Sequence, residues 1–126
     1  GPVWAPINQL MAEALYAYHD HFGRALLMPD GTAIELEAAA VDLVQRLVSL
    51  FKRGSDERRP FFGTEDYFQT DPHWRDYLWF YEHFHAETGE GLGASHQNGW
   101  TALIAKLLQT QGKTVITPLP DRNMGE

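Results

Sequence analysis

The sequence predicts a single, mainly α-helical domain, and three observations support that prediction. The chain has 126 residues, the size of one small domain. Its composition is 44% hydrophobic and 13% aromatic, which is enough to build a packed core. Three windows, residues 6 to 22, 36 to 53 and 99 to 111, repeat apolar side chains with the period of an amphipathic helix. We expect helices there, packed as consecutive antiparallel hairpins.

The first helix is predicted to begin at Pro6 and to end at Gly23. Its apolar stripe consists of Ile7, Leu10, Met11, Ala14, Leu15, Tyr18 and Phe22. The Met-Pro-Asp-Gly run at residues 28 to 31 is typical of a turn, because proline fixes φ and glycine tolerates a positive φ. The flanking residues 25 to 27 and 32 to 34 therefore predict a short hairpin.

A second helix is predicted over residues 36 to 53, with acidic residues toward its start, Lys52 and Arg53 at its end and Gly54 after it. Its apolar stripe consists of Leu36, Ala40, Leu43, Val44, Leu47, Leu50 and Phe51. Residues 54 to 70 have no clear period and predict a long loop. Loops of that length usually have a function.

Residues 71 to 85 carry two competing signals. Asp71 and Pro72 have the form of an N-cap and first helical residue, and a short helical stripe would follow at Trp74, Tyr77, Leu78 and Tyr81. Read as a strand, the segment from Leu78 would send one set of side chains to each face. The first set is Phe80, Glu82 and Phe84, and the second is Trp79, Tyr81, His83 and His85. A helical turn followed by an extended segment satisfies both signals.

The final helix is predicted after a glycine-rich turn at residues 88 to 93, with Asn98 as its cap. Its stripe consists of Trp100, Leu103, Ile104, Leu107, Leu108 and Gln111. Two prolines and scattered polar residues predict a loose tail over residues 112 to 126.

Charge and composition argue against several classes of partner. Seventeen acidic against ten basic side chains give a formal charge of -7, and no basic stripe suits a nucleic acid. The absence of cysteine excludes disulfides, thiolate zinc sites, iron-sulfur clusters and a thiol nucleophile. No apolar run approaches the roughly 20 residues that span a bilayer, so we expect a soluble protein without a membrane partner. A start at Gly1 rather than at Met suggests a processed product or a piece of something longer.

The densest group of unusual residues lies at 70 to 85, where aromatic rings alternate with carboxylates. This combination suits a sugar, because the C–H face of a pyranose packs on a ring while its hydroxyl groups need polar partners. The structural alternative is an aromatic core with Asp71, Asp76 and Glu82 as caps or surface charges. Glu82 stands between aromatic residues and should be desolvated, which gives a carboxylate the shifted proton affinity of a general acid or base.

The histidines offer a rival interpretation, an imidazole metal site. Its candidate ligands are His83, His85 and His96, with His73 as a further one. Such histidines are more often hydrogen-bonded structural residues, so we expect their rings to diverge and the protein to need no metal and no cofactor.

A resemblance favours the sugar site. Gly1-Pro2-Val3-Trp4-Ala5-Pro6-Ile7-Asn8 resembles the Gly-Pro-(Val/Ile)-Trp-x-x-x-Asn signature of glycoside hydrolase family 63 and its bacterial relatives, the α-glucosidase and mannosylglycerate hydrolase group. Residues 68 to 77, 80 to 89 and 93 to 101 resemble the closing section of one bacterial and fungal branch. The similarity runs from Gly1 to about Gln111.

The fold implied by this resemblance is an (α/α)6 toroid, in which six helical hairpins surround a sugar site. Residues 1 to 111 would be a C-terminal segment of that catalytic domain, and the rest of the barrel would lie upstream. The family inverts the anomeric centre with two carboxyl groups separated by roughly 6.5 to 9.5 Å. The base corresponds to Glu82, in a Tyr-Glu-x-(Phe/Tyr) segment, whereas the acid is an Asp that has no counterpart here.

The resemblance also implies the sugar-binding residues. Trp4 and Trp100 would be apolar platforms, with Asn8 and His96 as hydroxyl partners and Trp74 as a further contact; Arg75 and Asp76 either join them or brace the loop. The predicted function is therefore the C-terminal portion of an inverting α-glycosidase with a carbohydrate substrate. The alternatives are a non-catalytic carbohydrate-binding or subunit-contact domain, and a histidine-based metalloprotein.

Overall fold

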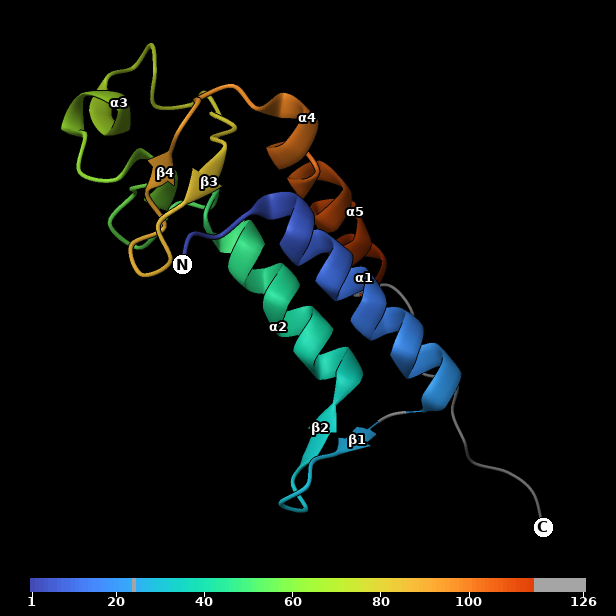
Figure 1. The fold of residues 1–126 in the computed structure, drawn as a ribbon. Coiled ribbons are helices and arrows are strands. Elements are labelled where there is room, and N and C mark those ends of the chain that lie inside the picture. Colours follow the sequence, from blue (N-terminus) through green and yellow to red (C-terminus); the bar gives the residue numbers. More distant parts are fainter. Residues whose placement is uncertain (24, 115–126) are drawn as a thin grey trace.

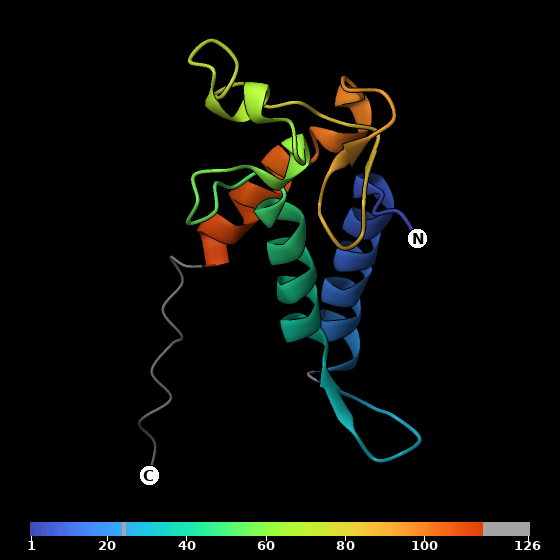
Figure 2. The ribbon, with the colours of Figure 1, turned by 90° about the vertical axis from the view of Figure 1, so that its left-hand side faces the viewer.

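The computed structural model describes residues 1–23 and 25–114, and its fold is mainly helical. Helices α1 (Ala5–Phe22) and α2 (Leu36–Ser49) lie side by side and antiparallel (Figures 1 and 2). Strands β1 (Ala25–Leu27) and β2 (Ala33–Glu35) form the hairpin at the far end of this pair, with Leu26 opposite Ile34. The predicted helical hairpin and its β-turn are therefore confirmed.

The predicted helix ends hold to within a few residues. Gly23 ends α1 with a φ of 96°, a conformation that favours glycine, and its N–H donates to the His19 carbonyl at 3.0 Å. Helix α2 ends at Ser49, four residues before the predicted end, and single turns follow it.

The buried face of α1 differs from the prediction. The helix buries Ala5, Gln9 and Ala12, whereas most of the predicted stripe is exposed to solvent. The exposed members are Ile7, Leu10, Met11, Ala14, Tyr18 and Phe22. Ala5 and Ala12 have small side chains, which allow a neighbouring element to approach α1 closely on the inward face. The larger apolar residues lie on the opposite face. Helix α2 behaves as predicted and buries Leu36, Ala40, Val44 and Leu47.

The segment after α2 is more ordered than the predicted loop. It contains the 3₁₀ turn η1 (Pro60–Phe62) and the short helix α3 (Asp66–Thr70). Of the two signals after Asp71, the helical one gives a hydrogen-bonded turn at residues 72–76, in which the Arg75 N–H donates to the Asp71 carbonyl at 2.9 Å, and residues 77–79 have no regular secondary structure. The predicted strand shrinks to β3 (His83–Phe84), which pairs antiparallel with β4 (Gly91–Leu92).

The predicted final helix is split in two. Helix α4 (Asn98–Thr101) is followed by a turn and then by α5 (Ile104–Thr114). The prediction of Asn98 as cap is wrong: Gln97 occupies the N-cap position, without a side-chain hydrogen bond, and Asn98 is already helical. Helix α5 includes residues 112–114 of the predicted tail, and the rest of that tail lies outside the described residues.

The core lies where the ends of α2 and α5 meet the aromatic loops. Its buried members include Val44, Leu47, Val48, Phe51, Phe61, Phe62, Phe84, Ile104 and Leu107. Thr101 is fully buried as well, and its hydroxyl donates to the Tyr81 carbonyl. The core interpretation is therefore right for part of the aromatic segment. Within the described part of the chain, no helix is both long and apolar enough to cross a membrane.

Candidate functional site

Three aromatic rings from distant parts of the chain meet beside β3. Trp4 precedes α1 and stacks on His83, with ring centroids 4.7 Å apart and planes 27° apart. Trp100 of α4 contacts the other tryptophan, with a Trp4 to Trp100 centroid distance of 5.7 Å. The pairing of Val3 with Phe84, through backbone hydrogen bonds of 2.8 and 2.9 Å, holds the N-terminal segment against β3. The two predicted tryptophan platforms are thus neighbours.

Glu82 lies at the edge of this aromatic group. Its backbone N–H donates to the Ala94 carbonyl at 2.9 Å, and the Ala94 N–H donates to Glu82 Oε2 at 3.3 Å. Gly93 has a φ of 75°, and a Cβ there would lie 2.6 Å from Glu82 Oε2 and 3.2 Å from His83 Cε1. The half-buried Glu82 side chain and the stacked His83 ring therefore both lie against Gly93. The positive φ and the close contacts at this position favour glycine.

The aromatic residues next to Glu82 in the sequence do not surround its side chain as predicted. Phe80, Tyr81 and Phe84 pack on the hydrophobic core, so they stabilise the segment rather than enclose the carboxylate. Burial raises the pKa of Tyr81, and the carboxylates of Glu90 and Glu65 raise it further. Tyr81 is therefore a neutral phenol next to Glu82 in the chain at neutral pH.

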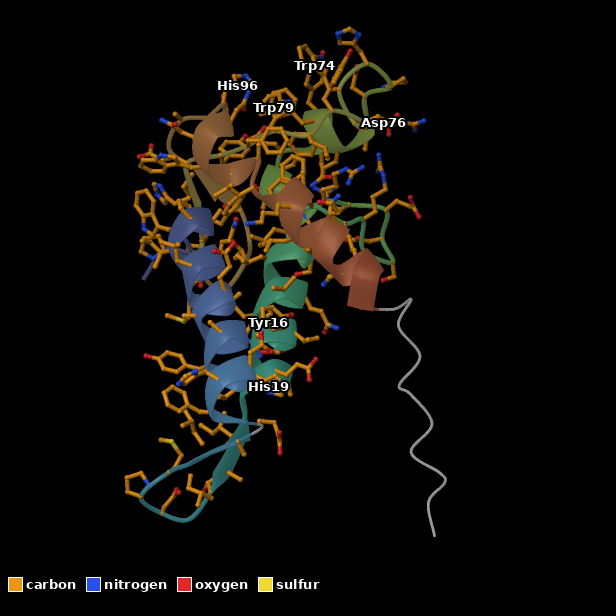
Figure 3. All side chains as sticks on the ribbon, turned by 90° about the vertical axis from the view of Figure 1, so that its right-hand side faces the viewer. Tyr16, His19, Trp74, Asp76, Trp79 and His96 are labelled. Carbon is orange, nitrogen blue, oxygen red and sulfur yellow. The ribbon has the colours of Figure 1, made fainter. Side chains whose placement is uncertain are left out.

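A second aromatic group contains the other two predicted sugar contacts. Trp74 and His96 both approach Trp79, at centroid distances of 6.2 and 6.0 Å (Figure 3). With His73, Tyr77 and Leu78 these residues line an open pocket of about 300 Å³. The backbone of His96 is fixed there because Phe80 pairs with it and the Phe80 carbonyl accepts the Gln97 N–H at 2.7 Å. Trp79 is a site residue that the sequence analysis did not single out.

Asn8 is separate from both aromatic groups. Its Nδ2 donates to the Trp4 carbonyl at 2.8 Å, so the amide stabilises the first turn of α1 directly behind the tryptophan. Asn8 also lines a cavity of about 390 Å³, together with Leu47 of α2 and the segment from His85 to Gly89. The structure thus gives Asn8 a local role in holding the Trp4 backbone.

The three histidines of the rival interpretation have different surroundings. His83 stacks on Trp4, His96 lies near Trp79, and His85 Nδ1 accepts the N–H groups of Glu87 and Thr88 at 3.4 and 3.3 Å. Across residues 1–23 and 25–114, no three His, Asp or Glu side chains come together as a metal-binding set. His83 Nδ1 is buried and has no hydrogen-bond partner among the described residues.

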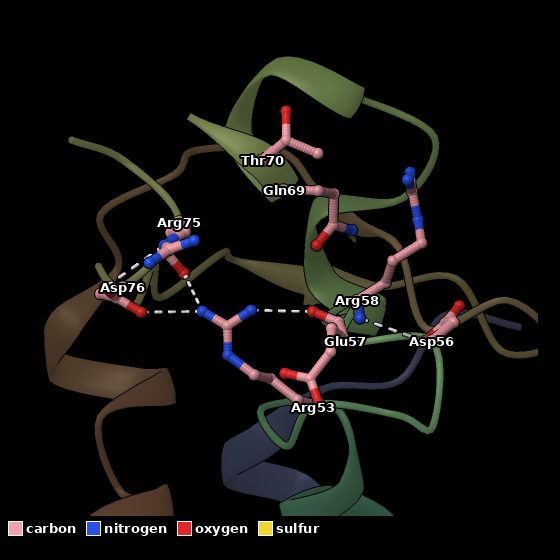
Figure 4. A pocket seen from close by; sticks show the side chains of 8 residues that line it. All are labelled: Arg53, Asp56, Glu57, Arg58, Gln69, Thr70, Arg75 and Asp76. Atoms are coloured by element: carbon pink, nitrogen blue, oxygen red, sulfur yellow. Dashed lines mark hydrogen bonds and ion pairs between the residues drawn. The ribbon is translucent and has the colours of Figure 1, made fainter. Parts of the chain in front are cut away.

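A charged pocket of about 470 Å³ lies between the segment that follows α2 and the turn at Arg75 and Asp76, and Arg53 is at its centre (Figure 4). Arg53 Nη1 donates to the Glu57 carbonyl at 2.7 Å, while Nη2 donates to the Arg75 carbonyl at 2.9 Å and to Asp76 Oδ1 at 2.8 Å. The Arg75 Nε to Asp76 Oδ2 distance is 3.7 Å. Asp76 therefore braces the loop mainly through Arg53, which ties the end of α2 to the turns that carry Trp74.

Replacement of Arg53 by Lys should loosen this tie. An ammonium cannot reproduce the planar fork that reaches three oxygens on two separate loops. We expect the free energy of unfolding to fall by about 1 to 2 kcal/mol, the size of one or two lost hydrogen bonds, as measured by urea denaturation. Arg46→Lys is the matched control, because Arg46 is exposed and its side chain, within the part of the chain that the structure describes, bonds Asp42 on the same helix. Equal effects of the two substitutions would contradict a special role for Arg53.

Comparison with known proteins finds no matching family model and no matching solved structure. It does find a similar protein of Saccharomyces cerevisiae, which carries the name "Uncharacterized protein YMR196W". The two are 38% identical over 118 residues, which cover 89% of this chain and 11% of the yeast protein. The chain thus matches a short part of a much longer relative.

Proposed function

We propose that this chain is the C-terminal portion of an inverting α-glycosidase and supplies its general base, Glu82. The observation that carries the proposal is the grouping of Glu82, His83, Trp4 and Trp100, in which a half-buried carboxylate adjoins stacked rings. A pyranose needs a flat apolar surface for its C–H face and a carboxylate for the reacting water. In this proposal the hairpin of α1 and α2 belongs to an (α/α)6 toroid completed by the rest of a longer polypeptide.

In this proposal Glu82 accepts a proton from a water molecule as that water attacks the anomeric carbon. The bond to the leaving oxygen breaks on the opposite face, and a carboxylic acid from outside this chain donates a proton to that oxygen. Inversion requires the two carboxyl groups to lie roughly 6.5 to 9.5 Å apart, which leaves room for the water. Gly93 and Ala94 orient Glu82, since one approaches Oε2 closely and the other donates a hydrogen bond to it.

The second aromatic group extends the proposed sugar-binding wall. Trp74, Trp79 and His96 offer two large rings and a polar imidazole around an open pocket. These rings suit a second sugar unit, because they pack on C–H groups while the His96 imidazole can bind a hydroxyl; the Trp74 Nε1–H already donates to the Tyr67 hydroxyl at 3.2 Å. Arg53 and Asp76 would support this wall from behind.

A non-catalytic carbohydrate-binding or subunit-contact domain is the second candidate. The exposed face of α1 and the open pocket at Trp74 favour this second candidate, because both can serve binding without a catalytic reaction. The two candidates differ in what the longer polypeptide does to a glycoside. The first hydrolyses it, whereas the second binds it unchanged.

The proposal predicts the stereochemistry of the product. The longer polypeptide should cleave an aryl α-glucoside or α-mannoside and release the β-anomer first, because the water attacks opposite to the leaving group. Proton NMR of the anomeric signals during the first minutes distinguishes the two anomers before mutarotation mixes them. Release of the α-anomer first would contradict an inverting base, and binding without cleavage would support the second candidate.

A further inference from the structure

Helix α1 has two opposite faces, and its more apolar face is the one that is exposed to solvent. At about 100° per residue, the inward residues Ala5, Gln9 and Ala12 lie opposite a continuous outward stripe. The stripe consists of Ile7, Leu10, Met11, Ala14, Tyr18 and Phe22. Leu10 is 63% exposed and Phe22 is 65% exposed. An apolar stripe that runs the length of a helix and is exposed to solvent is typical of an interaction surface.

The outward stripe is long enough to contact a whole helix rather than a single side chain. From Ile7 to Phe22 it runs about 22 Å, at about 1.5 Å per residue. The acidic side chains of α1, Glu13 and Asp20, lie off the stripe, and Glu13 is bonded to Lys106 of α5. In Figure 2, α1 lies beside α2 at one edge of the helices. Figure 3 shows Tyr16 and His19 on the α2 side of α1, away from the stripe.

We propose that this stripe is the docking surface for an amphipathic helix from another part of the same, longer polypeptide. About nine-tenths of the yeast relative lies outside the matched segment, since the match covers 11% of its length. A second copy of this chain fits less well, because each copy carries a formal charge of -7 and the two would repel. The inference rests on the proposed function in one respect, the completion of the helical fold by the rest of a longer polypeptide, and it needs no catalysis.

The test is capture in trans. The tagged 126-residue chain is co-expressed with the yeast protein from which the matched segment has been deleted, and the captured yeast polypeptide is quantified. We expect the two to co-purify as an equimolar complex. Ala14→Glu should lower capture by about tenfold or more, because the charge would be buried at the centre of the stripe. Ala38→Glu is the matched control, an equally exposed alanine on α2 outside the stripe, and should leave capture unchanged.

Two measurements on the chain alone keep the result interpretable. Ala14→Glu should not change its helical circular dichroism or its thermal midpoint, because Ala14 is exposed there. Sedimentation at micromolar concentration should show a monomer. A dimer that Ala14→Glu dissociates would overturn the proposal in favour of a second copy. Absence of capture, or equal capture by the Ala14→Glu and Ala38→Glu variants, would overturn it as well. Capture is measured without a substrate, so a loss of catalysis and a loss of docking are separate results.

Discussion

Replacement of Glu82 by Gln in the longer polypeptide, under the proposed glycosidase function, should lower kcat by roughly 10²- to 10⁴-fold, the contribution of a general base. The amide keeps the shape of the side chain, and its oxygen can still accept the Ala94 N–H. It cannot accept a proton from water. Substrate affinity should change much less, because the rings of Trp4 and Trp100 remain. Steady-state kinetics with an aryl α-glycoside separates kcat from KM.

The matched control for this substitution is Glu87→Gln. Glu87 is an exposed carboxylate five residues along the chain, so kcat should stay nearly unchanged. Glu90 is a poorer control than its glycine-rich surroundings suggest, because it is half-buried with its side chain against Gly63. The isolated 126-residue chain should be inactive, since the proposal places the general acid outside it. Turnover by that chain alone, abolished by Glu82→Gln, would show that the acid lies within these residues.

Replacement of Phe84 by Ala should cost about 3 to 5 kcal/mol of the free energy of unfolding, the usual cost of removing a buried aromatic side chain. Phe84 is 0% exposed, and its ring meets that of Phe51 edge-on at 5.8 Å. Its backbone also pairs with Val3. The loss would therefore leave a cavity at the point where the N-terminal segment joins the core. Urea denaturation followed by circular dichroism measures it.

Leu78→Ala is the control for the loss at Phe84, because Leu78 is a large apolar residue in the same segment that is exposed to solvent. It should change stability by no more than about 0.5 kcal/mol. Phe84→Leu should lie between the two, because it leaves a smaller cavity. If Phe84→Ala lowered the free energy of unfolding as little as Leu78→Ala, the packing of Phe84 would not be important for the stability of the core.

The helices could be predicted from the sequence because apolar period is a local signal. The hairpin of α1 and α2, the turn between them and the end of α1 at Gly23 all follow from residues close together in the chain. The buried face of α1 could not be predicted in this way. Ala5, Gln9 and Ala12 give little hydrophobic signal, and α2 selects them by close approach rather than by their hydrophobicity.

The structure of residues 71 to 85 depended on contacts that no local pattern contains. Trp79 packs on Phe68 at 4.4 Å and on Phe62 at 5.5 Å, and these tertiary contacts accompany a segment that continues from the turn at residues 72–76 without regular secondary structure. The same applies to the candidate site. The resemblance indicated Trp4, Glu82 and Trp100, but the stacking of His83 on Trp4 arises only from the long-range pairing of Val3 with Phe84.

That pairing also sets the order in which the site can form. Joining Val3 to Phe84 closes a loop of about 80 residues. Closing a long loop lowers the conformational entropy of the chain before the contact contributes any stabilisation. The α1 and α2 hairpin needs only neighbouring sequence and can form while the chain is still being synthesised. Trp4 can meet His83 and Trp100 only after β3 and α4 have emerged from the ribosome. The proposed sugar-binding surface is therefore expected to form last in this segment.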